Sequence, residues 1–197
     1  MYFVGLDLGQ RVDFSALVVV ERIERRLAFQ QSQFAGLVVR YAERMPLGTP
    51  YPRVVARVRE IVRCDELLGK CSLSVDATGV GAPVVDMLSA AQLGCELNAV
   101  VMTGGQAATG GSVPKRDLLA EVQVLLDAGE LRIGKIREAA RLMRELADVR
   151  MSLSKSGRMA LGAEGTGQHD DLVIALALAC WRAKRRRVIG EVGRRLI

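Results

Sequence analysis

The chain has 197 residues, which is enough for one substantial domain with its own hydrophobic core. Half of the residues are hydrophobic and only 4% are aromatic, so the composition excludes a disordered chain and predicts a core of Val, Leu, Ala and Ile. The formal net charge of +6 favours a polyanionic partner. No apolar run reaches the length of a membrane span and no signal peptide precedes the first predicted strand, so we expect a soluble, cytoplasmic protein without a membrane partner.

Cysteine and histidine give little support for a zinc centre. The four cysteines, Cys64, Cys71, Cys95 and Cys180, have no CxxC spacing and are typical of small buried residues in a reducing compartment. His169 is the single histidine, which counts against a His-based zinc site and leaves one base for a Ser-His-Asp triad.

The N-terminal quarter of the chain predicts three neighbouring strands. Residues 2–9, YFVGLDLG, form a short apolar run that is typical of a buried central strand. Residues 14–21 follow after a short turn and should pair with the first strand in antiparallel fashion. Residues 37–45 alternate apolar and polar side chains, as a half-solvated third strand does. The polar stretch 22–36 is ambiguous.

Two strand–helix–strand units are predicted after this meander. Apolar residues recur with a helical period over 53–69, and residues 71–75 form a strand that ends at Asp76. A helix over 84–93 and a strand over 97–102 follow. Such units place consecutive strands parallel to one another.

The remaining elements can be read in chain order. They are a Gly-rich loop (103–113), a helix from Pro114 that stops at Gly129, a short strand (131–134), a helix (136–146), a hairpin (149–163) and a long apolar helix after Asp171. The fold class is therefore α/β. We predict a mixed sheet of five or more strands, in which an antiparallel meander of three strands joins parallel βαβ strands and helices flank the sheet.

Carboxylates end two of these strands and open the last helix. If the first and fourth strands are neighbours, Asp7 and Asp76 lie side by side, and the last helix can bring Asp170 and Asp171 to the same place. Carboxylates so close together repel one another unless cations bind, and oxygen ligands select Mg²⁺ or Mn²⁺. We therefore predict a two-ion catalytic site in which Asp7 bridges the ions, Asp76 binds one and Asp171, with Asp170 near it, binds the other. The alternatives are an arginine partner for Asp7 and helix capping for Asp170 and Asp171.

Basic residues near these acids are candidate contacts for DNA phosphates. Lys115 and Arg116 follow the Gly-rich loop, and Arg150, Lys155 and Arg158 lie on the predicted hairpin before the last acidic motif. A solvated helix start and an exposed turn are the alternatives. His169, beside the acids, is a candidate proton carrier in the second shell of ligands, with a structural role as its alternative.

Five segments, in the same order along the chain, resemble the nuclease domain of phage large terminase subunits. They are GLDLGQRVDFSALVVVER, RMPLGTPYPRVVARV, SVDATGVGAPVVDML, VPKRDLLAEVQVLL and GQHDDLVIALALA. The resemblance implies an RNase H-like fold and an endonuclease that cuts concatemeric viral DNA during packaging in the host cytoplasm. It also implies Mg²⁺ or Mn²⁺ on acids matching Asp7, Asp76 and Asp170 or Asp171. The implied partners are double-stranded DNA, a terminase ATPase domain, the small terminase subunit and the portal.

The chain departs from full-length large terminases in one respect. Those proteins carry an ATPase domain ahead of the nuclease, whereas we expect residues 1–197 to form a single nuclease domain without an ATPase domain. The nearest match to a Walker A loop is GQAATGGS at 105–112, which has Gly111 where the motif requires Lys.

Three other functions compete with this one. A RuvC-like junction resolvase would use a similar acid set, and branched DNA would distinguish it. An actin-like ATPase fragment would share the first strand and hairpin, but the helix after HDD has no role there. A non-catalytic packaging adaptor would bind DNA without needing the carboxylates. Nothing in the sequence suggests base-edge readout, so we expect little sequence preference in cleavage.

Overall fold

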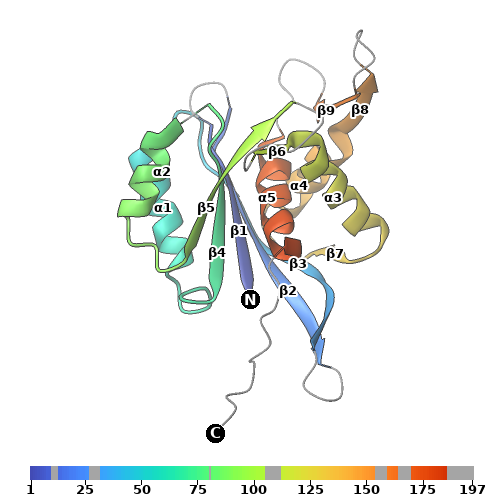
Figure 1. Cartoon of the computed structure of the whole chain (residues 1–197), viewed down its shortest axis with the longest axis horizontal. Coiled ribbons are helices and arrows are strands. Elements are labelled where there is room, and N and C mark those ends of the chain that lie inside the picture. Colours follow the sequence, from blue (N-terminus) through green and yellow to red (C-terminus); the bar gives the residue numbers. More distant parts are fainter. Residues whose placement is uncertain are drawn as a thin grey trace, which may run out of the picture.

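Seven strands form one mixed sheet in the order β6-β5-β4-β1-β2-β3-β7 (Figure 1). The computed structural model describes residues 1–9, 13–26, 32–79, 81–104, 112–153, 159–163 and 170–185. The sheet confirms the predicted mixed α/β class and is larger than the minimum of five strands.

The antiparallel half of the sheet is the predicted meander. It consists of β1 (Tyr2–Asp7), β2 (Ala16–Arg26) and β3 (Ser32–Arg44). In this register Asp7 lies opposite Ala16, and Ala16 lies opposite Arg44. Much of the ambiguous stretch 22–36 belongs to β2 and β3, because the two strands satisfy each other's backbone hydrogen bonds whatever their side chains are.

The parallel half contains β4 (Cys71–Asp76), β5 (Glu96–Thr103) and β6 (Ser112–Pro114), and β7 (Leu131–Ile133) pairs in parallel with β3 at the other edge. As predicted, β4 lies directly beside β1, with Leu6 opposite Val75. The short β6 corrects the prediction of a loop through residue 113. Its three residues pair in parallel with the last three residues of β5, whose outer edge would otherwise be unpaired.

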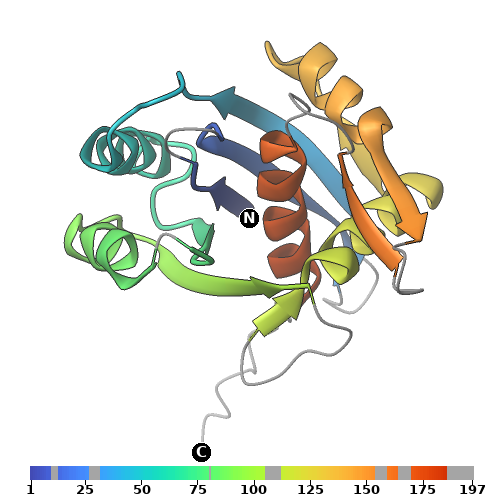
Figure 2. The ribbon, with the colours of Figure 1, turned by 90° about the horizontal axis from the view of Figure 1, so that it is seen from above.

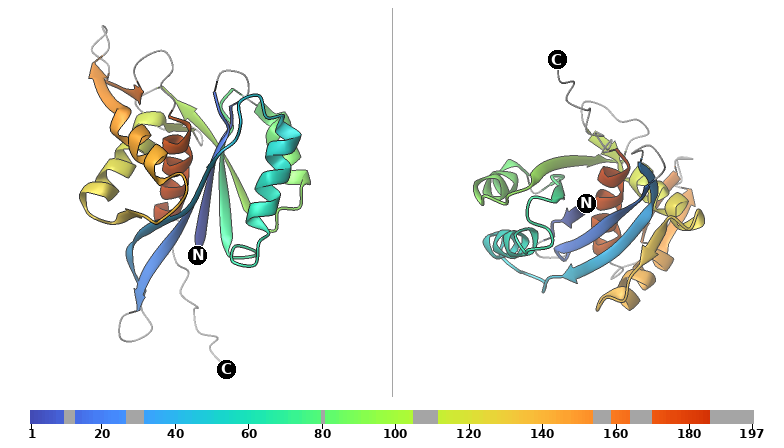
Figure 3. Two further views of the ribbon diagram at one scale, coloured as in Figure 1. Left: turned by 180° about the vertical axis from the view of Figure 1, so that it is seen from behind. Right: turned by 90° about the horizontal axis from the view of Figure 1, so that it is seen from below.

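Helices cover both faces of the sheet and give three layers (Figures 1 and 2). On one face, α1 (Tyr51–Val62) and α2 (Gly81–Ala90) pack over a core of apolar side chains from β1, β2 and β4. On the other face lie α3 (Lys115–Asp127), α4 (Ala139–Asp148) and α5 (Asp171–Arg185). Figure 3 shows the same layers from behind and from below, with the two-stranded sheet of β8 (Val149–Leu153) and β9 (Met159–Ala163) beside the helices.

The helix α5 is the centre of the second core. Eleven of its fifteen residues are buried, because it is held between the sheet on one side and α3 and α4 on the other. Gly5 of β1 makes this approach possible, since a Cβ at that position would lie 1.8 Å from the carbonyl oxygen of Ala175. Within the described ranges, no helix is both long enough and apolar enough to cross a membrane.

Candidate metal centre

Four aspartates meet at the end of the sheet where β1 and β4 finish. Asp7 is the last residue of β1 and Asp76 the last of β4, and the parallel register of these strands makes them neighbours. Asp170 and Asp171 stand at the start of α5, which packs over β1. All four line a cavity of about 390 Å³, so the structure brings together the four acids that the sequence singled out.

The two strand-end aspartates are held in conditions that disfavour their charged forms. Burial and the negative charges of Asp76, Asp171 and Asp170 raise the pKa of Asp7 well above its usual value, while Lys115 opposes this rise. Burial also raises the pKa of Asp76, although that carboxylate accepts a 2.8 Å hydrogen bond from the backbone N–H of Thr78. A bound cation would stabilise the charged form of both carboxylates.

Lys115, a predicted DNA contact, lies inside this cavity. It is the first residue of α3, and its Nζ is 2.7 Å from Oδ2 of Asp170. The backbone carbonyl of Asp170 accepts the N–H of Ile174 at 2.9 Å, so the residue caps α5 through its backbone while its carboxylate binds Lys115.

The other predicted contacts lie elsewhere or outside the described residues. Arg116 points to its neighbour Asp117, with 3.1 Å between Nε and Oδ1, and it does not line the cavity. Arg150 belongs to β8, and its side chain is outside the description. Lys155, Arg158 and His169 also lie outside the described residues. Their predicted roles stay predictions.

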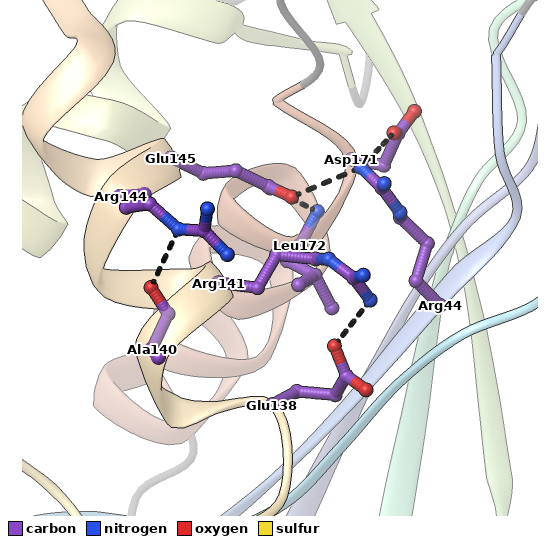
Figure 4. Close-up of polar contacts among 8 residues, drawn as sticks. All are labelled: Arg44, Glu138, Ala140, Arg141, Arg144, Glu145, Asp171 and Leu172. Atoms are coloured by element: carbon purple, nitrogen blue, oxygen red, sulfur yellow. Dashed lines mark hydrogen bonds and ion pairs between the residues drawn. The ribbon is translucent and has the colours of Figure 1, made fainter.

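Sequence reasoning missed a buried carboxylate behind Asp171. Glu145 of α4 is only 6% exposed, and its Oε2 accepts the backbone N–H of Leu172 at 2.9 Å (Figure 4). An N–H in the first turn of α5, which has no partner within the helix, is thereby satisfied by a side chain from a different helix. Burial raises the pKa of Glu145 to about 7, and Asp171 adds to the rise, while the Leu172 N–H and Arg44 oppose it.

Arg44 joins this carboxylate to the aspartate cavity. Its Nη1 lies 3.4 Å from Oε1 of Glu145 and 3.9 Å from Oδ2 of Asp171 (Figure 4). Its guanidinium also stacks on the ring of Phe14, 4.0 Å from the ring centre. The signal for Glu145 was present in the sequence, because Leu142 and Glu145 are three residues apart and so share the buried face of the predicted helix. No local pattern connects Arg44 to either acid.

The donor set is suited to hard divalent cations. Asp13, from the turn between β1 and β2, also lines the cavity, so five carboxylates of the described residues line it. Oxygen ligands of this kind select Mg²⁺ or Mn²⁺ over softer metals. Within the described ranges no three acidic, histidine or cysteine side chains stand at the spacing of a finished metal cage.

Comparison with known proteins places the fold. Neither family models nor curated proteins give a match to the sequence. Among solved structures, the chain is similar to the large terminase nuclease of thermophilic phage G20c with bound magnesium. The identity is 25% over 92% of this chain and 81% of that one, with a TM-score of 0.67.

Two further structures extend the comparison. The nuclease domain of the large terminase g2p from bacteriophage SPP1, with bound Mn, is 15% identical over 92% of this chain and 85% of that one, with a TM-score of 0.57. The large terminase of bacteriophage HK97 is 18% identical, with a TM-score of 0.53, and the match covers 91% of this chain and 38% of that one.

These relatives define the class of the domain as RNase H-like, with acids gathered at one end of a mixed sheet. Within that class, the solved neighbours are nuclease domains of large terminases from several phages, and they cover about 91% of the chain. The family resemblance that the sequence indicated is thereby confirmed.

Proposed function

We propose that the protein is a metal-dependent DNA endonuclease that cuts concatemeric viral DNA during genome packaging. The observation that carries this proposal is the cavity in which Asp7, Asp76, Asp170 and Asp171 converge from β1, β4 and α5. The magnesium and Mn bound in the similar terminase nuclease structures support it. The relatives and the acid cavity also favour a nuclease over the actin-like ATPase and the non-catalytic adaptor.

Each aspartate has a proposed place in the site. Asp7 would bridge two Mg²⁺ or Mn²⁺ ions, Asp76 would hold one, and Asp171 with Asp170 would hold the other. Bound in this way, the ions would supply an activated water and stabilise the charge that develops on the phosphate oxygens. The chain's own contribution is to fix the carboxylates, because Thr78 orients Asp76 and the Glu145–Arg44 pair holds the first turn of α5.

Metal binding would change the partner of Lys115. In the structure its ammonium neutralises Asp170. A cation that took over this carboxylate would release Lys115 into the cavity, where it could contact a substrate phosphate. This exchange keeps the predicted role of Lys115 as a DNA contact and adds the role of a temporary counter-ion.

The proposal also names the substrate, the partner proteins and the compartment. We assign double-stranded DNA as the substrate, with little sequence preference, and residues 1–197 as a single nuclease domain. A terminase ATPase domain, the small terminase subunit and the portal are the proposed partners, acting in the host cytoplasm. An attached motor would raise the local DNA concentration, so the domain should cleave more weakly alone than when attached to it.

Plasmid cleavage tests the proposal. Supercoiled plasmid is incubated with the protein in Mn²⁺, Mg²⁺ or EDTA, beside the Asp7→Asn variant and the control Asp65→Asn, which changes an exposed carboxylate outside the cavity. We expect nicking and linearisation that require metal, that Asp7→Asn abolishes and that Asp65→Asn leaves intact. Failure of the folded wild-type protein to cleave in either metal would overturn the proposal. Preferential cleavage of a four-way junction over linear duplex would favour the resolvase.

A further inference from the structure

A second cavity lies on the other side of Arg44 and is strongly basic. Its volume is about 540 Å³, and it is formed by the end of β3, α1, the connection from β7 to α4 and the start of α4. Figure 4 shows Arg44, Glu138 and Arg141 from this region. The cations that line it are Arg40, Arg44, Arg57, Lys135, Arg137 and Arg141. We call this cavity the basic groove.

The strand pairing explains why the groove exists. The edge strand β7 pairs with β3 only from Leu37 to Val39. After the Gly134 N–H has bonded to the carbonyl of Val39 at 3.1 Å, the chain turns away toward α4. Residues 40–44 of β3 therefore lose their neighbour on this side, and the connection 135–138 faces them across the groove.

Two of the groove's cations have no acidic partner in the ranges that the structure describes. Among the described residues, six cations and two carboxylates, Glu43 and Glu138, line it. Four of the cations form ion pairs, which are Arg40–Glu21, Arg44–Glu145, Arg57–Glu43 and Arg141–Glu138. Lys135 and Arg137 are exposed, and neither forms an ion pair within the described part of the chain.

The groove adjoins the aspartate cavity along one row of the sheet. Asp76 and Asp7 are neighbours on β4 and β1, Asp7 lies opposite Ala16, and Ala16 lies opposite Arg44. Two inter-strand spacings separate Asp7 from Arg44, which is roughly 10 Å. The groove is therefore within reach of the same DNA duplex whose phosphate is held at the aspartates.

We propose that the basic groove is a second DNA subsite, which binds backbone phosphates of the duplex next to the phosphate held at the aspartates. This proposal rests on the proposed nuclease function. The chemistry is that of sequence-independent phosphate binding, because Lys and Arg side chains contact phosphate oxygens and leave the bases unread. The exposed side chains of Lys135 and Arg137 supply the positive charge that has no acidic partner in the described part of the chain, and Arg44 lies between the two cavities.

DNA binding by a charge-reversed groove tests this proposal. The Kd of a fluorescein-labelled 30-base-pair duplex is measured in EDTA, which prevents hydrolysis, over a series of salt concentrations. We expect Lys135→Glu/Arg137→Glu to raise the Kd at least about tenfold and to lower the slope of log K against log salt by about 2. The neutral variant Lys135→Ala/Arg137→Ala should show a smaller loss in the same direction.

The matched control is Arg59→Glu/Lys70→Glu. It makes the same change in net charge at two exposed residues that do not line the groove. Equal losses in the control and the groove variant would overturn the proposal, because the groove would then act only through net charge. Binding of a poly-glutamate peptide that needs Lys135 and Arg137, with unchanged DNA affinity, would also overturn it and would assign the open edge of β3 to an acidic peptide.

Cleavage in Mn²⁺, measured on the same preparations, separates this proposal from the nuclease function. If the wild type cleaves plasmid and the groove variant binds DNA as tightly as the wild type, the subsite is wrong and the nuclease stands. If the groove variant loses DNA binding and the wild type does not cleave in any metal, the groove stands as a DNA site and the nuclease is wrong.

Discussion

Asp7 is the proposed bridging ligand of the site, and it lies where the charged form of its carboxylate is disfavoured. It is half-buried beside three other aspartates, and desolvation and the charges of these neighbours raise its pKa. The sequence singled out this residue because it ends an apolar strand between two glycines and because Asp76 and Asp170–Asp171 occur in similar settings. It could not show Glu145 or Arg44 as part of the same network, because their contacts with Leu172 and Asp171 join residues 27 and 127 positions apart.

The first prediction concerns the stability of Asp7→Asn. Because the fold disfavours the charged carboxylate, removing the charge should raise the free energy of unfolding of the metal-free protein at pH 7.5, by about 1 kcal/mol or more. Urea denaturation in EDTA measures this change. The same variant should lose the stabilisation that Mn²⁺ gives to the wild type. A variant that is less stable than the wild type in EDTA would contradict the electrostatic account of Asp7.

Glu145 leads to a prediction about pH. Its folded pKa of about 7 lies above the ordinary glutamate value, so the folded state holds its proton more tightly than the unfolded state does. The contribution of this group to stability is present below the ordinary value and is lost as the pH rises through 7, with a limiting size of about 3 kcal/mol. Urea midpoints in EDTA between pH 5 and 8.5 should therefore fall less steeply for Glu145→Gln than for the wild type.

The Glu145→Ala variant separates the effect of the carboxylate charge from the effect of the hydrogen bond to Leu172. Glutamine keeps an oxygen that can accept the Leu172 N–H, whereas Glu145→Ala leaves that N–H without its acceptor and Arg44 without this carboxylate. We expect the alanine variant to lose about 2–4 kcal/mol of stability, because buried groups that lose their partners are costly. It should also weaken Mn²⁺ binding, measured by calorimetry, since the first turn of α5 positions Asp171. Unchanged Mn²⁺ affinity would contradict the positioning role.

The order and type of the elements followed from the sequence to a large extent. The meander, the βαβ units and the buried final helix have strong apolar periods, and the structure confirms them. The lengths of β2 and β3 were less predictable, because a paired strand can be polar on its solvent face and then has no apolar signature. The three residues of β6 were missed for a related reason, since pairing with β5 and not composition makes them a strand.

The close packing of α5 on β1 leads to a prediction about Gly5. A methyl group on Gly5 would overlap the carbonyl oxygen of Ala175, which belongs to the backbone of a buried helix and cannot move aside alone. Gly5→Ala should therefore destabilise the protein by about 3 kcal/mol or more and displace Asp171 relative to Asp7. Gly104→Ala is the control, because a Cβ there meets nothing within 4 Å. Equal urea midpoints for the two variants would contradict this packing.

In the molecule as a whole, acidic and basic cavities lie next to each other across Arg44. The sheet brings the aspartates together at its centre, and the early end of β7 leaves the basic groove open at its edge. The sequence indicated the acids through their positions at strand and helix ends, together with a net charge suited to DNA. The sequence could not indicate the groove, because its cations come from β3, α1, α4 and the β7–α4 connection, which only the fold brings together.

The central claim is that the aspartate cavity holds the catalytic ions. Crystals of the protein grown with Mn²⁺ and measured near the manganese absorption edge would locate the metal directly by anomalous scattering. We predict two manganese peaks about 3.5–4 Å apart, with Asp7 between them, Asp76 on one and Asp171 on the other. Absence of a peak in this cavity at saturating Mn²⁺, or peaks confined to other surface carboxylates, would contradict the account.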